Sequence, residues 1–228
     1  SREDILRAVS HDLRNPLAVV QAQAQLLLRA LDRGAPAGEE RESARSILTS
    51  AQRMNVMIQD LVDSARLEAG QIRLNRQPVD LGALLEDLKQ RLRGALDVAR
   101  VHLEVPPGLP PAWADPDRLE RILVNLLSNA LKYSTPGTPV TVRVAVRDET
   151  IVISVADIGP PIAPEEMPHL FTRYYRAQAG RARHDSLGLG LYITRMLVEA
   201  HGGHIGVESG PQGTTFAFTL PAATRGNS

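Results

Sequence analysis

The chain has 228 residues, which suits one or two domains, and only 4% of them are aromatic, so Leu, Val, Ile and Ala have to build the core. Its net charge of +0 argues against a nucleic-acid-binding protein that works through a bulk basic field. It has no cysteine, which excludes disulfides and thiolate metal sites, and it has no signal peptide and no apolar run near the roughly 20 residues of a membrane span. Because the helical pattern opens without a start signal before Ile5, we expect a fragment whose upstream part is missing.

Two apolar stripes with steps of three and four residues predict an N-terminal hairpin of two helices. The segment between them, "DRGAPAG" (32–38), carries two glycines and a proline that break the helical pattern. The first stripe consists of Leu6, Val9, Leu13, Leu17, Val20, Ala24, Leu27 and Leu31. The second consists of Ala44, Ile47, Ala51, Met54, Ile58, Leu61 and Ala65. Because two helices with one narrow seam each cannot bury both seams alone, we expect a homodimer in which two hairpins form a four-helix bundle.

An unusual polar turn lies in "SHDLRNPLAVV" (10–20) on the first helix. His11 and Asp12 lie off the seam, so we expect them to face solvent, with Asn15 one turn after His11 on the same face. An imidazole whose second nitrogen donates a hydrogen bond to a carboxylate is a nucleophile near neutral pH, and Asp12 is placed to accept that bond. Asn15 could orient a water, and Pro16 loosens the helix at this turn. Taken alone, this helix favours the plainer interpretation of a surface histidine beside a surface aspartate.

From residue 69 onward the periodicity changes, and the pattern predicts an α/β sandwich built around one pocket. Its first part is expected to contain a strand over 73–81, a helix over 81–96, a strand over 101–105 and a Pro-rich loop over 106–114. Asp115 then caps a helix that has Pro116 in its first position and runs to about Tyr133. A hairpin of strands over 140–146 and 151–157, a helix within 186–203, and a closing hairpin over 204–209 and 213–220 complete the expected elements.

Asn125, Asn129 and Lys132 form a polar line on the helix that ends at Tyr133, at steps of four and three residues. Asparagine is a poor helix former and is costly to bury unpaired, so both amides need partners. Protein groups and a ligand are equally good partners when this helix is considered by itself.

Of two glycine-containing elements, the second points to an anionic ligand. The strand over 151–157 ends in Asp157 followed by "IGPPI", which alone is a common turn. Gly188 and Gly190 open a helix and leave bare backbone N–H groups at its positive end, which suits phosphate oxygens. The segment 160–186 between these elements carries four prolines and four arginines, as a lid over a polyphosphate would.

Together, five motifs resemble the catalytic core of a sensor histidine kinase of two-component signalling. "SHDLRNPL" resembles the H box, "RILVNLLSNALKYS" the N box, "DIGPPI" the first glycine box, "LFTRYYRA" the F box and "LGLGLYI" the second glycine box. One match is weak, but five in the correct order are specific and cover essentially the whole chain. The resemblance implies an α+β chain with a dimerisation and histidine-phosphotransfer hairpin (1–68) followed by a Bergerat-type ATP-binding domain (69–228).

The resemblance also implies an activity and the residues that carry it. ATP with Mg²⁺ would phosphorylate His11, which Asp12 polarises, and a response-regulator aspartate would then take the phosphoryl group. Asn15 resembles the residue that positions water when such enzymes dephosphorylate their regulators. Asn129 is implied as the Mg²⁺ ligand, and Asp157 as the acceptor for the amine of adenine. The other implied cofactor-binding residues are Asn125, Lys132, Tyr133, Gly159, Arg176, Gly188, Leu189 and Gly190.

Two positions depart from the family's pattern. Pro161 stands where the first glycine box has its second glycine, and Ser186 stands where the second box often begins with glycine. Proline has a fixed φ and no N–H, so we expect this chain to bind ATP more weakly than one with both glycines. The departures keep an alternative open, a kinase-like regulatory scaffold that binds a partner and transfers phosphate poorly. In a third interpretation, an ATPase or chaperone with the same nucleotide fold, the turn around His11 has no purpose.

The other histidines show no metal-ligand spacing with carboxylates, so we expect structural or surface roles for them. They are His102, His169, His184, His201 and His204. The expected partners are a second copy of the chain and a receiver domain, with no nucleic acid and with a membrane only through an upstream region. The expected location is the cytoplasm, including the cytoplasmic part of a membrane-bound sensor.

Overall fold

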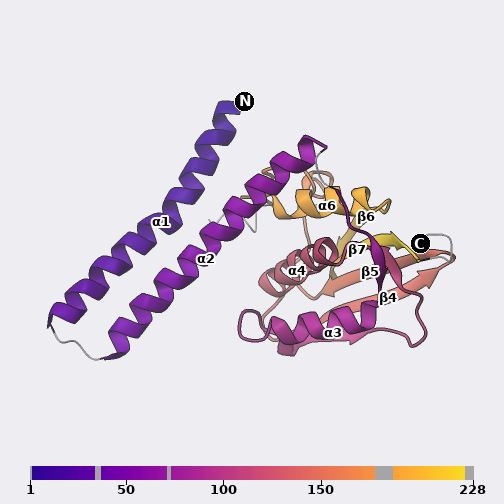
Figure 1. Ribbon diagram of the computed structural model, residues 1–228, viewed down its shortest axis with the longest axis horizontal. Coiled ribbons are helices and arrows are strands. Elements are labelled where there is room, and N and C mark those ends of the chain that lie inside the picture. Colours follow the sequence, from indigo (N-terminus) through magenta and orange to yellow (C-terminus); the bar gives the residue numbers. More distant parts are fainter. Residues whose placement is uncertain (1, 34–36, 71–72, 178–186, 224–228) are drawn as a thin grey trace. The chain divides into compact units, whose positions relative to one another are not determined.

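The computed structural model describes residues 2–33, 37–70, 73–177 and 187–223 (Figure 1). The chain forms two compact units, of which the first comprises Ser1–Gly70 with Arg173–Gly190 and the second Gln71–Thr172 with Leu191–Ser228. A helical hairpin makes up most of the first unit, and a mixed sheet with helices makes up the second. The α+β fold class is therefore confirmed. Among the helices that the structure describes, none combines the length and the apolar character needed to cross a bilayer.

The hairpin consists of α1 (Arg2–Arg33) and α2 (Ala37–Glu68), which lie side by side (Figure 1). Ala30 of α1 and Met57 of α2 are among its buried side chains. Several residues of the two predicted stripes remain outside this contact: Leu17 is 42%, Leu31 55% and Ile58 47% exposed. The exposure of these residues agrees with the expectation that two helices with one seam each cannot bury both seams within a single chain.

A five-stranded sheet forms the centre of the second unit, with strand order β2-β4-β5-β7-β6. β2 runs parallel to β4, and the other pairs are antiparallel. Its strands are β2 (Val101–Glu104), β4 (Val140–Arg147), β5 (Thr150–Asp157), β6 (Ile205–Gly210) and β7 (Gly213–Pro221). The short helices η1 (Val98–Arg100) and η2 (Met167–His169) precede β2 and follow β5, respectively. Burial alternates along β4, β5 and β7, so one face of the sheet carries the core, as the alternation in the sequence predicts.

The predicted Pro-rich loop over 106–114 is wrong at its end. Ala112–Ala114 form β3, which pairs antiparallel with β1 (Gln77–Val79), the only part of the predicted strand over 73–81 that is extended in this ladder. Ala112 and Ala114 are completely buried. The paired residues, which are 33 to 37 positions apart in the sequence, satisfy each other's backbone groups. A local sequence pattern does not reveal such a pairing.

Three helices accompany the sheet: α3 (Leu81–Arg91), α4 (Pro116–Tyr133) and α6 (Gly190–Ala200). The expected helix over 81–96 ends five residues early, shortly before Gly94, whose φ of +88° is incompatible with a continuing helix. α4 begins as predicted, since the Asp115 side chain accepts a hydrogen bond from the backbone N–H of Arg118 and Pro116 occupies the first turn. α4 packs on β4 and β5 through its buried residues Leu119, Ile122, Leu123, Leu126, Leu127 and Ala130.

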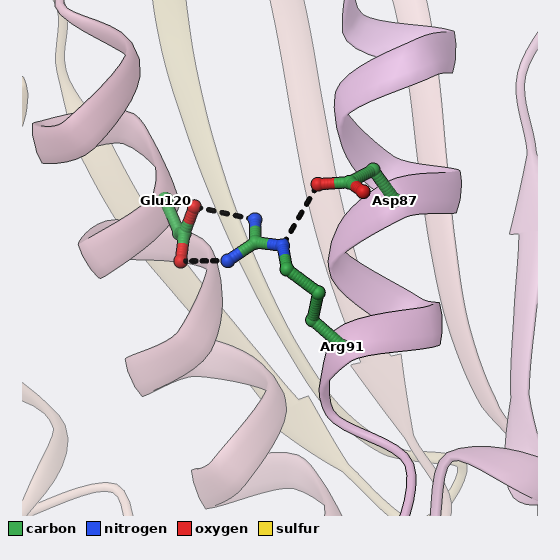
Figure 2. A network of polar contacts seen from close by, with 3 residues as sticks. All are labelled: Asp87, Arg91 and Glu120. Carbon is green, nitrogen blue, oxygen red and sulfur yellow. Dashed lines mark hydrogen bonds and ion pairs between the residues drawn. The ribbon is translucent and has the colours of Figure 1, made fainter.

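Arg91 joins the last turn of α3 to α4 (Figure 2). Its guanidinium donates two hydrogen bonds to the Glu120 carboxylate, at 2.8 and 2.6 Å, and a third to Asp87 at 2.8 Å. The hydrogen bonds to Glu120 and Asp87 raise the pKa of Arg91 above its already high ordinary value. Because this network is exposed, it orients the two helices more than it stabilises them.

His201 confirms the structural role expected for it. Its side chain is buried, and its Nδ1 lies 2.7 Å from the Leu197 carbonyl oxygen, while its Nε2 accepts a hydrogen bond from the Asp115 backbone N–H at 3.0 Å. This pattern requires a neutral ring, and burial lowers its pKa accordingly. His102, His169 and His204 are exposed, and His184 lies outside the described residues.

Candidate functional site

Asp157 ends β5 as a buried acid, with only 8% of its surface exposed. Its neighbours in the sheet are Val140 on β4 and Thr214 on β7. Within the described part of the chain its carboxylate has no hydrogen-bond partner, and burial raises its pKa to about 6 against a lowering influence from Arg100. A buried carboxylate of this kind is costly unless a donor reaches it, so the arrangement suits a ligand with an N–H group.

The turn after Asp157 packs against the end of α4. The Ile158 carbonyl accepts hydrogen bonds from the Thr135 backbone N–H at 2.8 Å and from Thr138 Oγ1 at 3.2 Å. A Cβ atom at Gly159 would lie 2.8 Å from the Tyr133 carbonyl oxygen and 2.9 Å from Asp157 Oδ1. Only glycine fits this approach, which places the expected residues Tyr133, Asp157 and Gly159 together.

Gly213 is a further constrained residue near Asp157 that the sequence analysis missed. It has a φ of +119°, and a Cβ atom there would lie 1.9 Å from the Asp157 carbonyl oxygen. Thr214, the next residue, is buried beside Asp157, and its Oγ1 lies 2.7 Å from Ser209 Oγ. The signal that could have revealed this position is a glycine directly before a strongly alternating strand.

The two asparagines of the polar line on α4 differ in their hydrogen bonding within the described residues: Asn125 has a protein partner and Asn129 has none. Asn125 Nδ2 donates to Thr194 Oγ1 of α6 at 2.8 Å, so a protein group is its partner. No side-chain hydrogen bond joins Asn129 to any other residue in the described part of the chain, although Asn129 is half-buried. The Lys132 ammonium lies 4.8 Å from the centre of the Tyr133 ring.

Asn129 fits the hard cation that the sequence leads us to expect. An amide oxygen is the ligand type that Mg²⁺ prefers, and this ion usually takes few protein ligands beside phosphate oxygens and waters. Among the described residues, no group of three or more His, Cys, Asp or Glu side chains could form a metal cage.

Gly188 precedes α6 and belongs to the first unit. Its φ is +68°, and a Cβ atom would lie 2.6 Å from the Tyr175 carbonyl oxygen and 3.1 Å from Arg176 Cγ. Leu189 is completely buried, and Gly190 is the first residue of α6. Gly188 thus allows a close approach between this segment and the F-box region. Ser186 lies outside the described residues.

The expectation that Asp12 faces solvent is wrong. Asp12 is buried, and its Oδ2 lies 3.3 Å from Arg176 Nη1, which belongs to the same unit. Arg173 forms a second ion pair in this unit, with Glu68 at the end of α2. Arg176 comes from a segment far along the chain, so helical periodicity alone could not reveal its contact with Asp12.

The backbone of His11 lies within α1, one residue before Asp12, and its side chain lies outside what the structure describes. Asn15, one turn later, is half-buried. Tyr174 has a φ of +62°, which is rare for a bulky residue, and the Arg173 guanidinium lies 4.7 Å from the centre of its ring. The H-box and F-box segments therefore meet in one unit through Asp12 and Arg176.

Two family models match separate stretches of the chain. The family described as "His Kinase A (phospho-acceptor) domain" matches residues 1–70, and the family described as "Histidine kinase-, DNA gyrase B-, and HSP90-like ATPase" matches residues 114–224. The sensor protein SrrB of Staphylococcus aureus is 30% identical over 223 residues, which cover 96% of this chain. The chain spans only 38% of the length of SrrB.

Solved histidine kinase structures share the fold. AdeS of Acinetobacter baumannii superposes with a TM-score of 0.71 at 24% identity, over 94% of this chain and 98% of AdeS. Full-length ShkA in complex with AMPPNP superposes with a TM-score of 0.67 at 28% identity, over 97% of this chain and 46% of ShkA. The mycobacterial kinase MprB superposes with a TM-score of 0.55 at 31% identity, over 64% of this chain and 98% of MprB. A phospho-acceptor domain followed by a kinase-type ATPase domain, in this order over nearly the whole length, means that the chain belongs to the ATP-dependent sensor histidine kinases of two-component signalling.

Proposed function

We propose that this chain uses ATP to phosphorylate His11 and then passes the phosphoryl group to an aspartate of a response-regulator receiver domain. The observation that carries the proposal is the buried carboxylate of Asp157, which has no partner in the described part of the chain and lies beside a turn where only glycine fits. The exocyclic amine of adenine would supply the missing donor. The complex of ShkA with AMPPNP, an ATP analogue, supports an adenine nucleotide as the ligand.

In the transfer, one ring nitrogen of His11 forms a bond to the γ-phosphorus, and the bond from that phosphorus to the bridging oxygen breaks. ADP leaves with the electron pair. Asp12 accepts a hydrogen bond from the second ring nitrogen of His11, which favours the positive charge that develops on the ring. The second transfer breaks the bond between phosphorus and His11, and a carboxylate oxygen of the receiver forms the new one.

Phosphoryl transfer depends mainly on positioning and on neutralising charge. Mg²⁺ would supply part of that charge, held by Asn129 together with phosphate oxygens and waters. Lys132 adds positive charge on the helix that carries Asn129. For Arg176 and for the backbone N–H groups at Gly188, Leu189 and Gly190, the family resemblance assigns a role in binding phosphate oxygens. Asn125 lines the same pocket while Thr194 orients its amide. Asn15 positions the water that hydrolyses the phosphorylated receiver.

The acceptor hairpin works as a homodimer in this proposal. Leu17 and Leu31 of α1 and Ile58 and Val62 of α2 are exposed apolar side chains that a four-helix bundle of two hairpins would cover. The boundary between hairpin and ATP-binding domain falls between residues 68 and 69. The reaction takes place in the cytoplasm, where ATP and receiver domains are available.

Incubation with Mg²⁺ and ATP labelled in the γ-phosphate tests the proposal. The wild-type chain acquires an acid-labile label, which a receiver domain then removes. His11→Gln keeps nucleotide binding and loses the label, and Asn129→Ala loses the label because Mg²⁺ is no longer held. A folded, nucleotide-bound wild type without label contradicts the kinase reaction and leaves the regulatory scaffold, while a labelled His11→Gln variant contradicts the acceptor assignment.

A further inference from the structure

Arg100 ends η1 directly before β2, and its guanidinium reaches the C-terminal end of α4. Its Nε donates to the Thr138 carbonyl at 2.7 Å, and its Nη2 donates to Ser134 Oγ at 2.5 Å and to the Thr135 carbonyl at 3.1 Å. Its Nη1 lies 3.5 Å from the Leu131 carbonyl oxygen in the last turn of the helix. A cation at this end of a helix is favourable because the helix dipole and the free carbonyls are negative there.

The same connection between α4 and β4 holds the turn that follows Asp157. Thr135 and Thr138, which Arg100 contacts through their carbonyl groups, both donate hydrogen bonds to the Ile158 carbonyl. The Ser134 Cα would be 3.1 Å from a Cβ atom at Gly159. Arg100 therefore holds the 134–138 connection in place, and this connection packs against the Asp157–Gly159 turn.

Arg100 also acts on Asp157 through its charge, because its positive field opposes the effect of burial on the carboxyl group. The other elements packed against Asp157 bring Val140 from β4 and Thr214 from β7, and α4 brings Tyr133 and Ser134. Of the titratable groups at this end of α4, the Lys132 ammonium lies over the Tyr133 ring. Among the described residues, Arg100 is thus the charged group whose field on Asp157 is appreciable.

We propose that Arg100 is a positioning residue for adenine recognition: it holds the 134–138 connection against the Asp157–Gly159 turn. This inference rests on the proposed nucleotide site. It concerns a residue that lies before the 114–224 region matched by the ATPase family.

Calorimetric titration of the whole chain with Mg²⁺·ADP and Mg²⁺·GDP between pH 5 and pH 8 tests the inference. In the wild type, ADP affinity falls as the pH falls through about 6, because a protonated, neutral Asp157 is a weaker acceptor for the amine of adenine than the carboxylate is. Arg100→Gln weakens ADP binding about tenfold at pH 7 and lowers the ratio of ADP affinity to GDP affinity. It also raises the pH at the midpoint of the fall in ADP affinity. Asp157→Asn reveals the pH dependence that comes from the phosphates of ADP alone.

Arg91→Gln is the matched control. Arg91 also contacts α4 with several hydrogen bonds, but it does so at Glu120, about 16 Å along the helix from Leu131. Arg91→Gln leaves the ADP affinity, the ratio of ADP affinity to GDP affinity and the pH midpoint of ADP binding unchanged.

The outcomes separate this inference from the proposed function. If Arg100→Gln loses affinity while the pH midpoint and the ADP preference stay at wild-type values, Arg100 has a merely structural role and the inference is wrong. If Asp157→Asn binds ADP as the wild type does, the proposed adenine site is wrong instead. Should Arg100→Gln not fold, Arg100→Lys decides: it retains the charge and the midpoint but weakens ADP binding, and wild-type affinity in this variant overturns the inference.

Discussion

Asp12 and Arg176 are 164 residues apart in the chain and form an ion pair of 3.3 Å, with only 12% and 16% of their side chains exposed. Such a pair is screened less by solvent than a surface pair. It also engages both residues for which we propose roles in catalysis, since Asp12 is expected to polarise His11 and Arg176 to neutralise phosphate. The Arg176 Nη1–H that serves Asp12 here is not available to a phosphate oxygen at the same time.

A double-mutant cycle with Asp12→Asn and Arg176→Gln should therefore give a coupling energy of about 1–2 kcal/mol in urea unfolding without nucleotide. The coupling should shrink when Mg²⁺·ATP is present, because the phosphates attract Arg176. The exposed pair Arg195–Glu199 is the control, with a coupling of about 0.3–0.5 kcal/mol. A coupling at Asp12–Arg176 no larger than this control would contradict the prediction.

Gly159→Ala should lower ATP affinity at least about tenfold, because the added Cβ meets the backbone of Tyr133 and the Asp157 carboxylate. Gly206→Ala is the matched control, since a Cβ atom there has nothing within 4 Å. Nucleotide titration of the two variants checks the prediction. Equal affinities in both would mean that the turn after Asp157 is not part of the nucleotide site.

Pro161→Gly should raise ATP affinity several-fold, because it restores a backbone N–H and a free φ to the glycine box. The next residue, Ile162, already donates its N–H to Ser209 Oγ at 2.9 Å, so the rest of the loop stays tied to β6. Pro164→Gly, in the same exposed segment, serves as control and should bind ATP as the wild type does. Unchanged or weaker affinity in Pro161→Gly would refute the expected cost of this proline.

The pH dependence of stability should reveal two opposing groups. Burial lowers the pKa of His201 below 6.5, so the unfolded chain binds the proton more readily and stability falls as the pH drops below 6.5. Burial raises the pKa of Asp157 from 3.8 to about 6, so the folded chain binds that proton first and stability rises as the pH drops through 6.

Asp157→Asn removes the second effect and leaves the first. Between pH 6.5 and pH 5 this variant should lose up to about 1.4 kcal/mol of unfolding free energy per pH unit, a steeper loss than in the wild type. Urea unfolding at several pH values measures both slopes. A variant whose slope is no steeper than the wild-type slope would show that Asp157 has an ordinary pKa.

Leu31→Asp combined with Ile58→Asp should convert the homodimer to a monomer, since both side chains are about half exposed in one chain and would be buried in the bundle. Thr49→Asp is the control, because Thr49 is exposed and lies about 180° around α2 from Ile58. Light scattering after gel filtration gives the mass. A dimer that survives the paired substitutions would place the interface elsewhere.

Features of the fold that depend on nearby residues were predictable. The Asp115 cap, the Pro116 start and the end of α4 at Tyr133 follow from local sequence, and the alternation in β4 and β5 predicted their hairpin. The pairing of β1 with β3 was not predictable, because the sequence pattern of neither segment indicates that the other is its partner. The burial of Asp12 was missed for the same reason, since its partner Arg176 follows 164 residues later.

The candidate site divides in a similar way. Asn129, Asp157 and Gly159 follow from motifs, and the structure adds that Asp157 and Gly159 share one turn beside the end of α4. Arg100 and Gly213 belong to no motif. Both are far from Asp157 in the sequence, and only the fold brings them close to it.

The position of β7 between β5 and β6 has a consequence for how the domain assembles. Among the strands that the structure describes, β7 is the last in sequence, yet it pairs with one side of the central strand β5 and is the only neighbour of β6. Until residues 213–221 join the sheet, β5 presents an unsatisfied edge and β6 has nothing to pair with. A chain cut before Gly213 would therefore lose two of the sheet's four ladders at once, and with them the strand that pairs with Asp157 on one side.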